Sequence, residues 1–200
     1  VMRFRPSRIA LFGYAHVPWM KKHQTMIDER ALPDAAARFA QAQAAALMLR
    51  EAGYVAIGID HFALPEDGLS MALQAGKMRR NFQGYTVDEA DALIGLGASA
   101  IGRLPQGHVQ NMPATGEYQR RVKAGDLATV RGHAMSDDDR AREAVIEKLM
   151  CEFGFGKGWL CLRHGDAALP LFDIANRMVA EGEYLQRRGD RYEIIEAMRP

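Results

Sequence analysis

A continuous apolar run at residues 54–59 constrains the fold of this chain more than any other stretch. It follows Gly53, which ends a long alanine-rich segment at residues 34–52. That segment is typical of a helix, because its apolar side chains recur at spacings of three and four, at Phe39, Ala42, Ala46 and Leu49. Strands that are apolar throughout are typical of parallel sheets covered on both faces. The helix and the run after it therefore predict one unit of an α/β fold.

The same alternation extends over the first hundred residues. Residues 8–17 and 94–101 predict two more strands, and residues 66–78 and 87–93 predict helices. Alternating strands and helices favour an α/β architecture with parallel strands. Three strands cannot close a barrel of eight, so this sheet needs strands that the chain lacks.

After Gln106 the pattern changes to mainly helical. We expect helices at 113–124, 137–153 and 166–181, a short strand at 128–134, and a hairpin of 184–187 with 191–195. Ser136 is the expected cap of the second of these helices. Two helices followed by a hairpin resemble a winged helix. The predicted domains are therefore 1–106, part of a β/α barrel, and 107–200, a small helical domain ending in the hairpin.

Composition excludes several classes of protein. The chain is 48% hydrophobic and 26% charged with a net charge of +1, which argues against nucleic acid or a membrane surface as a partner. Cys151 and Cys161 fit no common metal motif, and the dispersed histidines contain no i, i+4 pair. We expect no metal site in this chain and a reducing cytoplasm as its location. Because the chain opens on Val1 and a strand-like run follows almost at once, we also expect a piece of a longer protein.

Residues 81–86, Asn-Phe-Gln-Gly-Tyr-Thr, follow no apolar period. They read either as a loop shaped to meet a flat polar ligand or as an ordinary turn with a glycine at positive φ and two anchoring rings. The basic side chains before them, Lys77, Arg79 and Arg80, either receive carboxylates or form a solvated helix end.

Polar residues also gather where the predicted strands end, which is where α/β sheets bind ligands. Asp60 and His61 read either as an acid–base pair or as residues that tie down a loop, and His16 has the same two readings. Ala15 and Ile101 lie near such ends and have no polar side chain, so packing is their simplest role. The alternative is that their free backbone groups contact an adenine ring.

Four blocks of the sequence together resemble oxygen-independent coproporphyrinogen III oxidase, the radical S-adenosylmethionine enzyme of haem biosynthesis. They are residues 11–18, 58–63, 80–86 and 97–101, which read LFGYAHVP, GIDHFA, RNFQGYT and GASAI. The resemblance extends over essentially the whole chain, and RNFQGYT is its most specific block.

The resemblance implies a partial β/α barrel, a [4Fe-4S] cluster and two S-adenosylmethionine molecules. The implied reaction is oxidative decarboxylation of two propionates of coproporphyrinogen III to vinyls. By position, Ala15 and Ile101 match contacts to S-adenosylmethionine, and Phe12 and Gln83 match neighbours of these cofactors. The family further implies a cytoplasmic, monomeric enzyme; its electron donor is unknown.

One departure from the family bears on activity. The family's cluster ligands form C-x-x-x-C-x-x-C in the N-terminal half, and this chain has no such motif. We therefore expect the C-terminal portion of the enzyme, without cluster or radical chemistry of its own. Two alternatives stay open: a haem chaperone-like relative, and a non-catalytic winged-helix module that binds nucleic acid.

Overall fold

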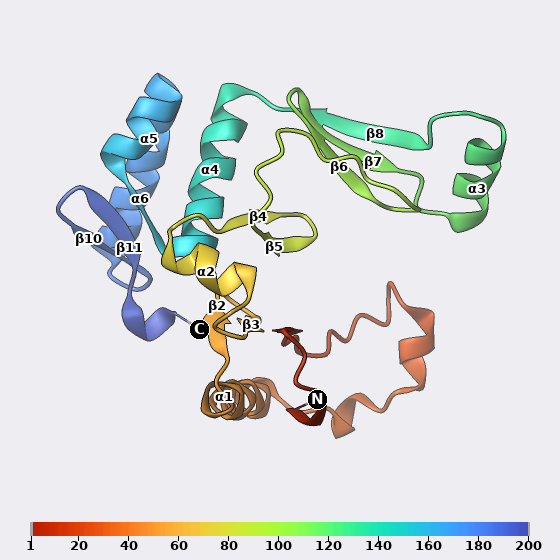
Figure 1. Ribbon diagram of the computed structural model, residues 1–200, viewed down its shortest axis with the longest axis horizontal. Helices are drawn as coiled ribbons and strands as arrows, with labels where there is room; N and C mark the ends of the chain where they lie inside the picture. The colour runs from red at the N-terminus through yellow and green to blue at the C-terminus, as the bar shows by residue number, and fades with distance from the viewer. Residues whose placement is uncertain (1, 200) are drawn as a thin grey trace. The chain divides into compact units, whose positions relative to one another are not determined.

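The computed structural model describes residues 2–199, which form two compact units (Figure 1). The first extends to Met78 and the second from Arg79 to Arg199. The expected division at residue 106 falls inside a β-hairpin of the second unit. The domain assignment 1–106 and 107–200 stays a prediction, because contact units need not coincide with the domains of the complete protein.

The first unit holds a three-stranded sheet and two helices, so its mixed α/β character is as expected. Its elements are β1 (Arg8–Ala10), α1 (Ala35–Glu51), β2 (Val55–Ile57), β3 (His61–Ala63) and α2 (Gly68–Gln74). The strand order is β1-β3-β2, and both pairings are antiparallel.

Parallel pairing was therefore the wrong expectation. β1 and β2 run in the same direction, but β3 lies between them and pairs with both. β3 returns along β2 after a turn that begins at Gly58, whose φ is +57°. The predicted strand at 8–17 is also too long, since only residues 8–10 pair and an irregular loop follows.

The helix at 34–52 is confirmed as α1. Asp34 caps it by accepting the Ala37 N–H at 2.8 Å, and Gly53 follows its end with φ +88°. One core cluster of the first unit consists of Leu49, Tyr54, Phe62 and Leu64. Of α1, only Leu49 is fully buried, so much of this helix faces outward within the described chain.

The second unit begins with two antiparallel sheets. They consist of β4 (Arg79–Asn81) with β5 (Gly84–Thr86), and of β6 (Ile101–Leu104), β7 (Gly107–Asn111) and β8 (Thr129–Ala134), while α3 (Thr115–Lys123) connects β7 to β8 (Figure 1). The expected strand at 128–134 and helix at 113–124 are confirmed.

Residues 87–101 contradict two expectations. No helix forms at 87–93. Instead, Thr86 Oγ1 accepts the Asp88 N–H and Asp88 Oδ1 accepts the Ala90 N–H, and such side-chain turns compete with a helical backbone. No strand runs from 94 to 101, since Gly97 and Ser99 adopt positive φ and the strand starts only at Ile101.

The rest of the second unit is helical with a small sheet. It holds α4 (Asp137–Glu152), β9 (Gly154–Gly156), α5 (Lys157–His164), α6 (Leu169–Glu181), β10 (Leu185–Arg188) and β11 (Arg191–Ile194). The hairpin β10–β11 is confirmed; β9, which pairs with β11, and α5 are additions to the predicted elements. In the core of this part, the Tyr192 ring stacks on the Phe172 ring, and Phe155, Leu160 and Leu171 belong to the same cluster. The winged-helix class and the partial barrel stay predictions.

Within the described residues, no helix combines the length and apolar character needed to cross a membrane.

Removing the cap of α4 should destabilise the second unit. Ser136 Oγ accepts the Asp139 N–H at 3.2 Å, and Asp139 accepts the Ser136 N–H in return, so both groups of a capping box are present. We expect Ser136→Ala to lower the free energy of unfolding by about 0.5–2 kcal/mol in urea titrations. Ser136→Thr keeps the hydroxyl and is the matched control.

The effect should depend on pH in one direction. Hydrogen bonds from the Ser136 hydroxyl and backbone lower the pKa of Asp139 in the folded chain. This contribution is complete above the unfolded pKa of about 4 and is lost as the pH falls through the lower folded value. A difference between wild type and Ser136→Ala that stayed constant through acidic pH would contradict the role of the carboxylate.

Candidate functional site

The stretch at residues 81–86 is a tight hairpin. Asn81 pairs with Gly84 across a two-residue tip made of Phe82 and Gln83, and Gly84 has φ +131°. Asn81 Oδ1 accepts the Gln83 N–H at 2.8 Å, which fixes the tip. Of the two rings, Tyr85 is buried and anchors the hairpin, whereas Phe82 is 63% exposed beside His108. The stretch is therefore a turn with one anchoring ring, and its tip presents Phe82 and Gln83.

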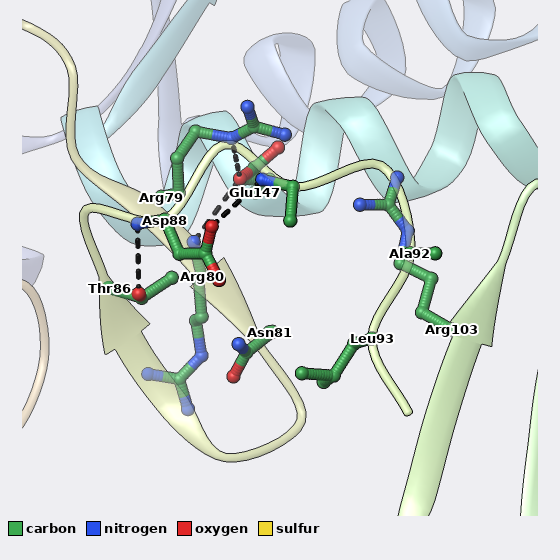
Figure 2. Close-up of a pocket in the computed structure, with 10 residues that line it drawn as sticks. Arg79, Arg80, Asn81, Thr86, Asp88, Ala92, Leu93, Arg103 and Glu147 are labelled. Carbon is green, nitrogen blue, oxygen red and sulfur yellow. Dashed lines mark hydrogen bonds and ion pairs between the residues drawn. The ribbon is translucent and has the colours of Figure 1, made fainter. Parts of the chain in front are cut away.

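The hairpin is attached to α4 by two kinds of contact. Glu147 Oε1 accepts from Arg79 Nε at 2.8 Å and from the Arg80 N–H at 3.2 Å (Figure 2). The Tyr85 hydroxyl donates to the Met150 carbonyl at 3.1 Å. The hydrogen bond to Glu147 raises the pKa of Arg79 above its ordinary value. Helix α4 thus holds both strands of the hairpin in place.

The basic pair Arg79 and Arg80 lies in β4, so the reading as a solvated helix end is wrong for both. Arg79 receives a carboxylate, but from Glu147 of the same chain, whereas the Arg80 guanidinium is directed away from it and lies 4.6 Å from the centre of the Tyr85 ring (Figure 2). The cavity between these residues and Arg103 measures about 30 Å³, which is room for a water and not for a cofactor. These contacts give the two arginines a structural role in holding the hairpin.

Gln83 and Ile101 lie together in the second unit. Gln83 Nε2 donates to the Ile101 carbonyl at 3.2 Å, although the two residues are 18 positions apart. The contact connects the tip of the β4–β5 hairpin to the first residue of β6. Two of the four residues expected at the cofactor site are thus in direct contact.

The backbone of Ile101 faces an edge of its sheet. Ile101 is opposite Gln110, but Asn111 N–H donates to Ala100 O, so the polar groups of Ala100 face β7 and those of Ile101 face away. On that far edge, among the strand residues that the structure describes, Arg103 has backbone pairing, through two bonds with Leu93. The edge therefore presents the N–H of Ile101 next to a carbonyl that Gln83 already contacts.

Phe12 and Ala15 lie on the loop that follows β1 in the first unit. Phe12 is 67% exposed and packs edge-on against His61, with ring centres 5.8 Å apart. The amide of Gln24 holds the backbone at Ala15: its Nε2 donates to Ala15 O at 3.1 Å and its Oε1 accepts from Val17 N–H at 2.6 Å. Gln24 is buried, and no sequence pattern distinguishes it from a loop glutamine. It is a positioning residue that the sequence analysis missed.

The histidines near this loop are tied to carboxylates. His61 Nδ1 lies 2.6 Å from Asp60 Oδ1, and His16 Nε2 lies 3.0 Å from Glu29 Oε1. Both arrangements agree with the reading that these residues tie down loops. His16 Nδ1 also lies 3.1 Å from the Tyr14 hydroxyl, which makes a chain of three side chains.

The two cysteines do not form a metal centre with other residues. Cys151 is 1% exposed, and burial, followed by the charge of Glu147, raises the pKa of its thiol to about 12. A thiol with that pKa stays protonated near neutral pH and is a poor ligand. Among residues 2–199, no group of three or more His, Cys, Asp or Glu side chains is placed to hold a metal ion.

Comparison with known proteins gives a consistent result. No protein-family model matches the chain. The chain is 54% identical over 180 residues to the oxygen-independent coproporphyrinogen III oxidase of Paracoccus denitrificans, covering 90% of this chain and 40% of the relative. It is 51% identical over 173 residues to the enzyme of the same name from Bradyrhizobium diazoefficiens, covering 86% of this chain and 38% of the relative.

The structure also matches a solved enzyme, coproporphyrinogen III oxidase (HemN) from Escherichia coli, which is described as a radical SAM enzyme. The TM-score is 0.86 at 29% identity, and the match covers 96% of this chain and 45% of the other. The chain thus has the mixed α/β fold of part of a radical SAM enzyme. It is homologous to the C-terminal part of oxygen-independent coproporphyrinogen III oxidases, and it spans about two fifths of the length of these relatives.

The attachment of the hairpin to α4 leads to a stability prediction. We expect Glu147→Ala to lower the free energy of unfolding by about 1–3 kcal/mol in urea titrations, because the Arg79 guanidinium and the Arg80 N–H both lose their acceptor. Glu147→Gln keeps an acceptor oxygen and should lose less. Glu181→Ala, at the exposed end of α6 and without an ion pair in the described chain, is the control. Equal stability of Glu147→Ala and Glu181→Ala would contradict the anchoring role.

Proposed function

We propose that the chain is the C-terminal part of an enzyme that converts coproporphyrinogen III to protoporphyrinogen IX. The 54% identity over 180 residues to a relative of that name is the observation that carries the proposal. In this reaction two propionate side chains become vinyls. Each conversion removes one hydrogen atom, breaks the bond to the carboxylate to release carbon dioxide, and passes one electron to an acceptor. Haem biosynthesis is the corresponding pathway.

The residues present fit one edge of an S-adenosylmethionine site. The adenine ring carries ring-nitrogen acceptors and an amino donor at fixed spacing, which a backbone N–H and carbonyl can match. The sheet edge at Ile101 offers such groups, and the exposed Phe82 ring lies beside Gln83 at the hairpin tip. S-adenosylmethionine, bound next to a reduced [4Fe-4S] cluster, supplies the ability to abstract a hydrogen atom.

We assign three tasks to residues of this chain. Ile101 binds adenine through its backbone, and Gln83 orients that backbone by donating to its carbonyl. Ala15 contacts the second S-adenosylmethionine through its backbone, which Gln24 holds in place. Phe12 and Phe82 provide apolar surfaces that keep water from the ligands.

The residues of this chain do not fit the iron–sulfur cluster. The sequence has no C-x-x-x-C-x-x-C motif, and the buried thiol of Cys151 stays protonated. We therefore propose that the cluster ligands belong to the part of the enzyme that this chain does not cover, and that the chain alone is inactive. The relatives reported above carry the oxidase name, so neither the haem chaperone-like alternative nor the nucleic-acid-binding alternative gains support from them.

Reconstitution tests the inactivity of the chain. After anaerobic treatment with iron and sulfide, the purified chain should show no absorbance near 400 nm from a bound cluster (roughly where thiolate-ligated Fe–S centres absorb), and no cleavage of S-adenosylmethionine with dithionite. The complete enzyme, treated in parallel, should show both and should convert coproporphyrinogen III. Cluster absorbance together with cofactor cleavage by the chain alone would overturn this part of the proposal.

Substitution of Gln83 tests the cofactor site. In the complete enzyme we expect Gln83→Ala to weaken S-adenosylmethionine binding by about 2–10-fold, the loss of one neutral hydrogen bond, with the fold retained. Gln106→Ala removes the same amide from the tip of the neighbouring β6–β7 hairpin, where its side chain has no hydrogen bond within the described chain, and is the control. Equal cofactor affinity and turnover in both variants would return residues 81–86 to the reading of an ordinary turn.

A further inference from the structure

A cavity in the first unit lies between the loop after β1 and helix α1. Its volume is about 490 Å³, in the range of sites for small organic ligands. The cavity is lined by residues 11–14 and His16 of the loop, by Leu32 and Pro33, and by one face of α1. Of the four residues assigned above to S-adenosylmethionine, Phe12 lines this cavity, and Ala15, Gln83 and Ile101 do not.

The wall on α1 combines small and polar side chains on a single face. Arg38, Gln41, Ala42 and Ala45 follow one another at spacings of three, one and three, so they lie along one side of the helix. Alanines leave room for a flat group to lie close to the helix backbone. The opposite wall includes the largely exposed ring of Phe12. These walls suit a flat, apolar ring system.

Arg38 contributes a positively charged side chain to the lining of this cavity. Within residues 2–199 it forms no ion pair, and Asp34, one turn earlier, accepts the Ala37 N–H as the cap of α1. Arg38 is exposed on α1 beside the apolar residues of the cavity, so its guanidinium is accessible to a ligand that carries a carboxylate.

The loop side of the cavity offers a hydrogen-bond acceptor. Glu29 Oε1 accepts from His16 Nε2 at 3.0 Å, and in the tautomer with its hydrogen on Nε2 the His16 Nδ1 accepts from the Tyr14 hydroxyl, 3.1 Å away. The Tyr14 oxygen then has lone pairs but no free proton, and it can accept an N–H. Cation, acceptor and apolar walls together match a pyrrole ring, which has an N–H, a flat face and a propionate.

We infer that this cavity binds one propionate-bearing pyrrole of the porphyrinogen, with Arg38 on the carboxylate and Tyr14 on the pyrrole N–H. The inference rests on the proposed function, which supplies the substrate, and it adds the residues that bind it. Gln24 and Glu29 are then positioning residues, because they hold the loop and His16 without contacting the ligand.

Two pairs of variants in the complete enzyme test the inference. We expect Arg38→Ala to raise the KM for coproporphyrinogen III about tenfold or more, since a charge-assisted hydrogen bond is lost, while the affinity for S-adenosylmethionine stays unchanged. Arg50→Ala removes the same charge from the exposed end of α1 and should behave as wild type. Ala42→Leu, which fills the cavity, should also raise KM, whereas Ala44→Leu on another face should not.

A binding measurement separates the possible failures. Fluorescence titration with coproporphyrin III, the oxidised porphyrin, should show about tenfold weaker binding to Arg38→Ala than to wild type, and circular dichroism checks that each variant is folded. The tetramethyl ester, which has no carboxylate, should not distinguish the two proteins. If wild type converts coproporphyrinogen III while Arg38→Ala and Ala42→Leu match their controls in both assays, the inference is overturned and the proposed function stands. If wild type neither binds the porphyrin nor converts the substrate, the proposed function itself fails.

Discussion

The carboxylate of Glu147 is the contact on which the candidate site of the second unit depends. One of its oxygens accepts both the Arg79 side chain and the Arg80 backbone, so it fixes the direction of β4 as well as its position on α4. A two-residue turn has little freedom once its strands are fixed, because cross-strand pairing sets the register of the tip. Gln83 reaches Ile101 only in that register, since a slip by one residue would turn its side chain to the other face. The hydrogen bond between Gln83 and Ile101 thus depends on the Glu147 carboxylate, which belongs to a helix much later in the chain.

Recognition by backbone groups explains how residues without polar side chains can belong to a binding site. Ile101 and Ala15 offer a ligand only their main-chain donors and acceptors, and in each case a glutamine amide holds the carbonyl: Gln83 for Ile101 and Gln24 for Ala15. A backbone carbonyl has two lone pairs, so an amide that occupies one leaves the other for a ligand. In both places a glutamine side chain orients the peptide group, and we propose that the peptide group contacts the ligand.

Local signals predicted much of the fold. Asp34 and Gly53 delimit α1, Ser136 begins α4, and Gly189 with Asp190 forms the turn of β10–β11. What failed depends on partners far along the chain or on competing side chains. β1 pairs with β3 although the whole of α1 lies between them in the chain, a pairing that no local pattern encodes. The side-chain turns made by Thr86 and Asp88 compete with a helix at 87–93. For the candidate site, resemblance supplied the four residues proposed to meet the cofactors, whereas the roles of Gln24 and Glu147 became visible only from their contacts in the structure.

The backbone groups of Ile101 and the guanidinium of Arg38 suit two different ligands, adenine and a propionate. Adenine is neutral and rigid, so peptide groups at a strand edge can match it without paying for a buried charge. A propionate is anionic, and neutral backbone groups compensate a carboxylate less well than a guanidinium does, especially beside apolar walls such as Phe12 and Ala42. Arg38 is exposed on α1, so water solvates its guanidinium and a ligand carboxylate can take the place of that water. Arg38 therefore makes sense on a surface that meets a carboxylate, while Ile101 makes sense where no charge has to be balanced.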